Sequence, residues 1–121
     1  MQVSEIYRRG IVLAATPLAL KSLRDNNIEL DTQVSCVPIS ETLFERLWAG
    51  AFVRDLNNAC GTSFDDHEQD FLPHGQLDVA IRLLDDRMVE NADVEMMTFC
   101  ENLRSLLQEA KSRGYPVLFV F

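Results

Sequence analysis

The chain has 121 residues, of which 47% are hydrophobic and 25% charged, and its formal net charge is −8. Length and composition predict a single folded domain with one core and disfavour a disordered chain. The negative charge disfavours direct binding to nucleic acid, and no apolar run approaches the roughly 20 residues that a membrane span needs.

The first third of the chain predicts a strand, a helix and a second strand. Residues Glu5 to Ala14 contain β-branched and aromatic residues in a short apolar run, which predicts a strand. Arg8-Arg9 before this run also resembles a secretion signal, but Pro17 interrupts the apolar stretch and favours the strand. Thr16-Pro17 is typical of a helix start, and Asn26-Asn27 is expected to end that helix. Gln33 to Val37 alternates weakly and predicts the second strand.

Three further helices and a terminal strand are predicted for the rest of the chain. Ser40 is expected to cap a long amphipathic helix that reaches Ala59, and the residues from Thr62 to Leu72 are expected to form a polar, acidic loop. Another helix opens at Pro73, and a short break at Glu90-Asn91 separates it from the fourth. Tyr115 to Phe121 is an apolar strand that must pair inside a sheet, beside the first strand.

The predicted order of elements is β-α-β-α-α-α-β. It indicates an α/β, two-layer domain over residues 1–121, in which a small sheet of the N- and C-terminal strands packs against about four helices. Trp48 shares the faces of the long helix with Leu43, Leu47 and Phe52, so it is expected in the core. An exposed contact with a partner is the alternative for this residue.

The negative charge is concentrated in one segment. From Asp55 to Glu95 there are 11 acidic residues and only two basic ones, Arg82 and Arg87, so this segment carries −9. Residues 1–54 sum to zero and residues 96–121 to +1. A concentrated field of one sign steers and holds a partner of the opposite sign. The sequence therefore favours a protein that binds a basic partner over an enzyme.

The residues that could support metal binding or catalysis lie around the predicted acidic loop. The loop lacks the calcium-binding pattern and H-E-x-x-H, so no metal site is predicted. Asp65 with Glu68 as an acid–base pair, or Cys60 with His67 as a nucleophile and base, are the catalytic alternatives, but nothing local activates them. The three cysteines are widely spaced and lack C-x-x-C, which predicts reduced thiols in a cytoplasmic protein. We therefore expect no enzyme activity, no cofactor and no metal.

Aromatic residues are interleaved with the acids of the same loop. Phe64 and Phe71 lie within it, although a loop that only confers solubility has no need of aromatic side chains. An aromatic anchor within a ring of charge is typical of an interface hot spot. Two alternatives stay open: a solvated face that keeps the protein soluble, and aromatics that only tether the loop to the core.

The segment from Asp65 to Leu77 reads D-D-H-E-Q-D-F-L-P-H-G-Q-L. This run resembles a pattern of bacterial toxin-immunity proteins, D-D-x-E-x-x-[FY]-L-P-x-x-Q-L leading into a helix, and it covers about a dozen of the 121 residues. The resemblance implies a protein similar to the immunity proteins of polymorphic toxin or contact-dependent growth inhibition systems. Those proteins bind a cognate toxin domain in the cytoplasm and block it.

Charge and resemblance together predict an immunity protein that neutralises a cognate basic toxin domain. A nuclease is expected, because an enzyme that holds phosphate is basic. The alternative is an acidic adaptor or regulatory protein that binds a basic host protein without neutralising a toxin. No contact with nucleic acid or membrane is expected, and the oligomeric state is left open. The expected contact surface comprises Asp65, Asp66, His67, Glu68, Asp70 and Phe71, extended by Asp78, Asp85 and Asp86.

Overall fold

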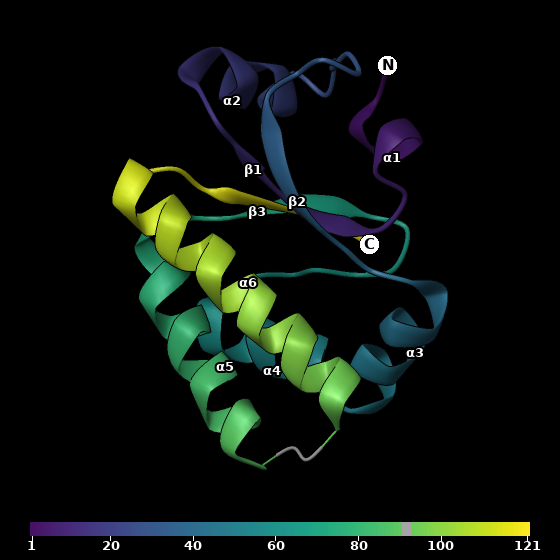
Figure 1. The fold of residues 1–121 in the computed structure, drawn as a ribbon, viewed down its shortest axis with the longest axis vertical. Coiled ribbons are helices and arrows are strands. Elements are labelled where there is room, and N and C mark those ends of the chain that lie inside the picture. The colour runs from purple at the N-terminus through teal and green to yellow at the C-terminus, as the bar shows by residue number, and fades with distance from the viewer. Residues whose placement is uncertain (91–92) are drawn as a thin grey trace.

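The computed structural model describes residues 1–90 and 93–121, except for the side chain of Glu90. Its elements are α1 (Val3–Ile6), β1 (Gly10–Ala14), α2 (Pro17–Arg24), β2 (Val34–Pro38), α3 (Glu41–Ala49), α4 (Phe52–Cys60), β3 (Gln69–Leu72), the short 3-10 helix η1 (His74–Gln76), α5 (Leu77–Glu90), α6 (Val94–Arg113) and β4 (Val117–Val120). Figure 1 shows these elements arranged around one sheet, which confirms the predicted α/β class.

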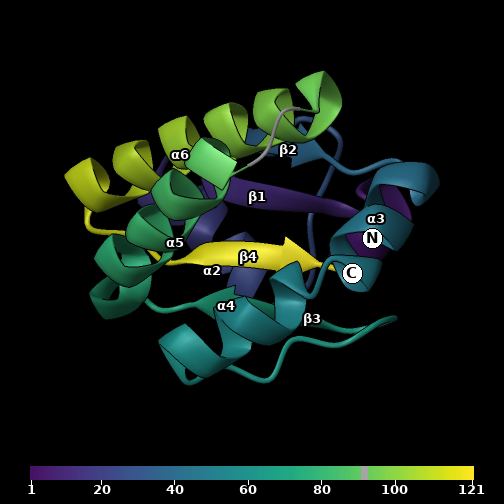
Figure 2. The same ribbon diagram turned by 90° about the horizontal axis from the view of Figure 1, so that it is seen from below.

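The four strands form one antiparallel sheet in the order β2-β1-β4-β3. β4 lies between β1 and β3 (Figure 2), so both of its edges are paired. Every residue of β1 and of β4 is buried, and this burial is the reason that both sequences are almost entirely apolar. The prediction that the terminal strand pairs beside the first strand is confirmed. The free edges of the sheet belong to β2 and β3.

Helices cover both faces of this sheet. Helices α3 to α6 lie on one face and form with it the larger hydrophobic cluster, which includes Ile11, Phe119 and Leu103. Helices α1 and α2 lie on the opposite face (Figure 1), where Val12 and Leu23 belong to a smaller cluster. The predicted two-layer packing of sheet against helices is confirmed, and the two N-terminal helices give additional cover to the second face.

The expectation of one long helix from Ser40 to Ala59 is wrong, because the chain turns between α3 and α4. Gly50 ends α3, and Ala51 has a left-handed backbone conformation, with φ of 60°, immediately before α4. A straight helix of 20 residues would be about 30 Å long and would carry its second half away from this small sheet. The turn instead brings Phe52 into the same core as Leu47.

Two other segments differ from their expected bounds. The first strand begins at Gly10 rather than Glu5, because residues 3–6 form α1, where the Gln2 amide donates a hydrogen bond of 2.9 Å to the Glu5 carboxylate. The expected loop over residues 62–72 contains the strand β3. Its polar side chains carry no strand pattern, but its backbone pairs with β4 at the sheet edge, where exposed polar side chains are tolerated. The expected break at Glu90-Asn91 lies partly outside the described residues.

We predict that Ala51→Gly stabilises the protein by about 0.5–1 kcal/mol, because glycine removes the steric cost of a left-handed alanine. Ala59→Gly, the same change inside α4, should destabilise it by a similar amount, because glycine is a poor helix former. Urea unfolding followed by circular dichroism measures both. Equal destabilisation by the two variants would contradict the strained turn at Ala51.

Candidate functional site

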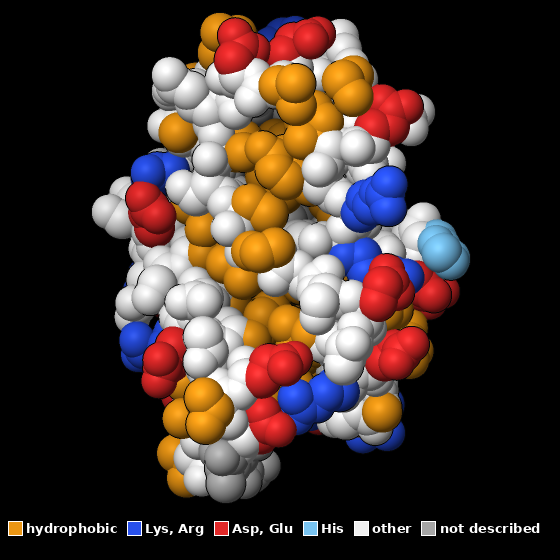
Figure 3. All heavy atoms as spheres, turned by 45° about the vertical axis from the view of Figure 1, so that its right-hand side comes forward, with side chains coloured by type: hydrophobic (Ala, Val, Ile, Leu, Met, Phe, Trp, Pro, Cys, Tyr) orange, Lys and Arg blue, Asp and Glu red, His pale blue; other side chains and the backbone are white. Residues whose placement is uncertain are grey.

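Most acids of the 55–95 segment are engaged in ion pairs, and most of the basic partners come from other parts of the chain. The pairs include Asp55 with Arg87, Asp66 with Arg9 at 2.9 Å, Asp78 with Lys111 at 2.8 Å, Asp85 with Arg104 at 2.5 Å, and both Asp93 and Glu95 with Arg46. On the face that Figure 3 shows, acidic side chains are accordingly interspersed with basic ones. Acids that lie in one segment of the sequence are therefore paired with bases at different places in the folded protein.

The predicted contact surface is divided in the same way. Asp78, Asp85 and Asp86 lie on α5, which begins beyond the C-terminal end of β3, whereas Asp65 to Glu68 precede the N-terminal end of that strand. Asp78 and Asp85 face bases of α6, and Asp86 is exposed. The expected contact residues on α5 are therefore not contiguous with those that precede β3. Residues 65–70, called the acidic turn below, remain together.

The acidic turn projects three carboxylates into solvent. Asp65, Glu68 and Asp70 are exposed, and within residues 1–90 and 93–121 none of them has an ion-pair partner. The carboxylate of Asp65 accepts a hydrogen bond of 2.8 Å from the Asp66 amide, and that of Asp70 accepts one of 2.8 Å from the Phe71 amide. His67, with φ of 61° and a side chain that is 85% exposed, lies at the apex.

Asn57 of α4 fixes the approach to the acidic turn. Its Nδ2 donates to the Phe64 carbonyl at 3.0 Å, while its Oδ1 accepts hydrogen bonds of 2.8 Å from the Phe64 amide and from the Thr62 hydroxyl. These three bonds hold Phe64 in the core, where its ring stacks on Phe119 with the centroids 4.7 Å apart. Nothing in the sequence around Asn57 indicates this role, because its partners are defined only by the loop conformation.

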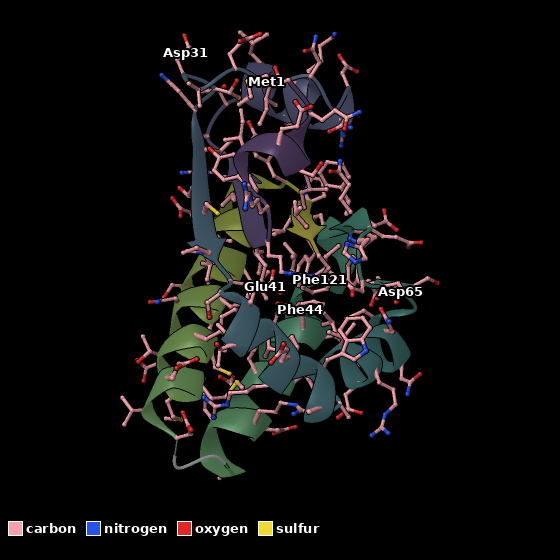
Figure 4. All side chains as sticks on the ribbon, turned by 90° about the vertical axis from the view of Figure 1, so that its right-hand side faces the viewer. Met1, Asp31, Glu41, Phe44, Asp65 and Phe121 are labelled. Carbon is pink, nitrogen blue, oxygen red and sulfur yellow. The ribbon has the colours of Figure 1, made fainter. Side chains whose placement is uncertain are left out.

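Arg9 fixes the middle of the acidic turn from the other side. Its guanidinium donates to Glu41 at 2.7 Å, to Asp66 at 2.9 Å and to the backbone oxygen of Phe121 at 2.6 Å. It also lies over the Phe44 ring, 3.6 Å from the centroid, and only 11% of the side chain is exposed. Figure 4 shows Glu41, Phe44 and Phe121, three of these partners, close to one another, with Asp65 farther out. The hydrogen bond from Arg9 holds the pKa of Asp66 below its ordinary value.

A groove of about 500 Å³ lies beside this arginine. Its lining combines α1, the arginine pair, the start of α3, the acidic turn and the end of β4, and it includes Arg8, Glu41, His67 and Glu68. Arg8 is exposed and has no ion-pair partner among the described residues. Charges of both signs therefore border the groove. The sequence did not predict a groove beside Arg8-Arg9.

The aromatic residues of the segment have separate positions. Phe64 is buried in the larger cluster, so it tethers the loop to the core, as one of the alternatives predicted. Phe71 is half-buried and packs against the smaller cluster on the opposite face of the sheet. Trp48 differs from its expected core position, because 39% of it is exposed. It lines a hollow of about 280 Å³ together with Phe64 and Asn57.

The alternative of Cys60 with His67 is not assembled as a nucleophile and its base. The Cys60 thiol is buried and lies 3.9 Å from the Gln76 carbonyl, whereas His67 is on the exposed acidic turn. Burial raises the pKa of Cys60, which disfavours a reactive thiolate. Within the described ranges, no three histidine, cysteine, aspartate or glutamate side chains converge as a metal-binding group.

We predict that Arg9→Met destabilises the protein by roughly 2–3 kcal/mol. The change leaves the Phe121 oxygen without its donor and removes two charge-assisted hydrogen bonds, whose contribution is reduced because Glu41 and Asp66 are partly exposed. Arg8→Met is the matched control and should change the free energy of unfolding by less than about 0.5 kcal/mol. Equal effects of the two variants in urea unfolding would refute the structural role of Arg9.

We also predict that stability falls as the pH drops below about 4. Three carboxyls have lowered pKa values because basic side chains donate hydrogen bonds to them: Asp66, Asp78 and Asp93. The unfolded chain binds more protons than the folded one in this range, so the stabilisation is present above the unfolded pKa and is lost as the pH falls through the folded values. Urea midpoints from pH 7 to pH 3 measure the loss.

Asp66→Asn should reduce this dependence on pH, and Asp86→Asn, at an exposed position of α5, is the matched control. An Asp66→Asn protein that loses as much stability in acid as the wild type would contradict the assignment.

Comparisons of the chain with protein-family models, with curated proteins and with solved structures return no match. None of the helices in the described ranges has the length and apolar character needed to cross a bilayer. The resemblance of residues 65–77 to immunity proteins therefore stays a prediction.

Proposed function

We propose that this protein binds a basic protein through the acidic turn, and that it acts as an immunity protein that neutralises a basic toxin domain in the cytoplasm. One observation carries the proposal. Asp65, Glu68 and Asp70 are exposed carboxylates without an ion-pair partner in the described ranges, whereas most other acids of the 55–95 segment are paired.

The rigidity of the turn supports a binding role. Asn57 fixes its start, Arg9 fixes its middle, and the pairing of β3 with β4 fixes its end. A surface held in one conformation before it meets its partner loses little conformational entropy on binding. Its carboxylates can then form charge-assisted hydrogen bonds with arginine or lysine, and the net charge of −8 accelerates the encounter.

A nuclease toxin is the partner that fits this chemistry best. An enzyme that holds a phosphate backbone must carry a basic surface, and a small acidic protein can cover that surface by charge complementarity. The immunity-like run begins at Asp65, so it includes the same carboxylates. An adaptor that binds a basic host protein would use the same contacts, so binding alone does not separate the two functions.

The partner is sought by pull-down from lysate of the native organism at low salt, followed by elution at high salt and mass spectrometry. We expect a basic protein at equal stoichiometry, encoded beside this gene. Its enzyme activity should be inhibited by one equivalent of this protein. A basic partner whose activity is unaffected would favour the adaptor, and recovery of abundant basic proteins alone would overturn both.

We predict that Asp65→Ala, Glu68→Ala and Asp70→Ala combined weaken binding to the recovered partner about tenfold to a hundredfold, since each exposed charge pair contributes roughly 0.5–1 kcal/mol. The variant should also show a smaller loss of affinity between low and high salt. Glu29→Ala, Asp31→Ala and Glu101→Ala combined remove the same charge from exposed positions elsewhere and serve as the control. Isothermal titration calorimetry on the two triple variants measures both effects, and equal losses would refute this site.

A further inference from the structure

We propose that the hollow beside Trp48 receives one apolar side chain, aromatic or long aliphatic, presented by a basic segment of the partner. This inference rests on the proposed function and specifies the partner's contact residue. It begins with Trp48, whose ring is held against two neighbours, with centroids 5.2 Å from Phe44 and 6.3 Å from Phe121. The indole is therefore fixed in place while 39% of the residue stays exposed.

The hollow has the size and lining of a side-chain pocket. Its volume of about 280 Å³ lies at the lower limit of ligand pockets, roughly 300 Å³, so it suits one side chain rather than a free ligand. Trp48, Val53 and Phe64 supply apolar walls, and Asn57 and Asn58 supply polar groups. A fixed tryptophan in an apolar hollow is typical of the anchor position of an interface.

The surroundings of the hollow select a basic partner. Asp65 directly follows Phe64, and Asp70 lies opposite Phe119, on which Phe64 stacks, so both acids flank the Phe64 wall. Glu45 is exposed one helical turn before Trp48 on α3. Arg54, the charged residue of the lining, is 72% exposed and lies 3.4 Å from the Asp55 carboxylate, which Arg87 also engages. Glu45, Asp65 and Asp70 outnumber this cation around the hollow. An apolar anchor bordered by acids is complementary to an apolar residue bordered by lysine or arginine.

A second copy of this chain is a poorer occupant. Two molecules that each carry −8 would bring Glu45, Asp65 and Asp70 against like charges. Sedimentation of the free protein tests this alternative. A dimer that dissociates on Trp48→Ala would overturn the assignment to a basic partner.

The test uses two defined probes, the blocked peptides Lys-Lys-Phe-Lys-Lys and Lys-Lys-Gly-Lys-Lys. Trp48 is the single tryptophan of the chain, so its fluorescence reports on the hollow directly. We expect the phenylalanine peptide to shift this emission and to bind at least fivefold more tightly than the glycine peptide. Calorimetry should show that Trp48→Ala abolishes the difference and that Leu30→Ala, at another exposed apolar position, preserves it.

The outcomes separate the hollow from the charge of the turn. Equal binding of the two peptides, weakened by salt, would overturn the hollow and leave the electrostatic proposal intact. Absence of binding by the phenylalanine peptide would also overturn the hollow, whatever the pull-down returns. Trp48→Phe keeps an aromatic ring in this position and should retain at least half of the preference, which controls for a fold disturbed by alanine.

Quenching of the same tryptophan tests the charge around it without any peptide. Relative to its effect on free N-acetyltryptophanamide, caesium should quench Trp48 more strongly than iodide does, because nearby acids attract the cation and repel the anion. Stronger quenching by iodide would overturn the acidic border of the hollow.

Discussion

The position of β4 at the centre of the sheet is the constraint on which the rest of the structure depends. This strand pairs with β1 near the start of the chain and with β3 in its middle, and all its residues are buried. A strand that is covered on both faces needs apolar side chains on both. Alternate residues of β4 therefore belong to two separate hydrophobic clusters, one on each face of the sheet. The end of β4 then brings Phe121 to Arg9, Phe44 and Trp48.

That junction connects folding with the candidate site. Arg9 directly follows the exposed Arg8, yet only 11% of its own side chain is exposed. Its donors are divided between the start of α3, the acidic turn and the end of β4. A planar guanidinium with several donors can hold three segments at once, which a lysine ammonium does with less geometric definition. The acidic turn is consequently positioned by contacts that belong to the core of the fold.

The net negative charge of the protein does not act as a single acidic surface. Asp78 and Asp85 of α5 form ion pairs with Lys111 and Arg104 of α6 and so connect the two helices. Asp65, Glu68 and Asp70 of the acidic turn combine exposure with a backbone that Asn57, Arg9 and the pairing of β3 with β4 hold in place. In the proposed complex, specificity arises from these carboxylates and from the apolar hollow next to them, while the net charge governs the rate of encounter.

The sequence by itself determined the elements whose signals are local or strongly patterned. Thr16-Pro17 and Ser40 start helices as expected, and the apolar run after Tyr115 forms a buried strand beside β1. Local capping and burial suffice for these, because the chemistry lies within a few residues. The edge strand β3 was not predicted, because its stability comes from backbone pairing with β4 rather than from its own side chains.

Tertiary structure alone decided which acids remain available. Asp66 and Asp65 are neighbours with the same side chain, but Arg9, 57 residues before Asp66, engages only Asp66. Trp48 likewise has the pattern of a core residue, yet 39% of it is exposed. Charge and hydrophobicity are properties of residues and can be read along the chain. Pairing and exposure depend on which distant segments the fold brings into contact, so they are decided only when the chain has folded.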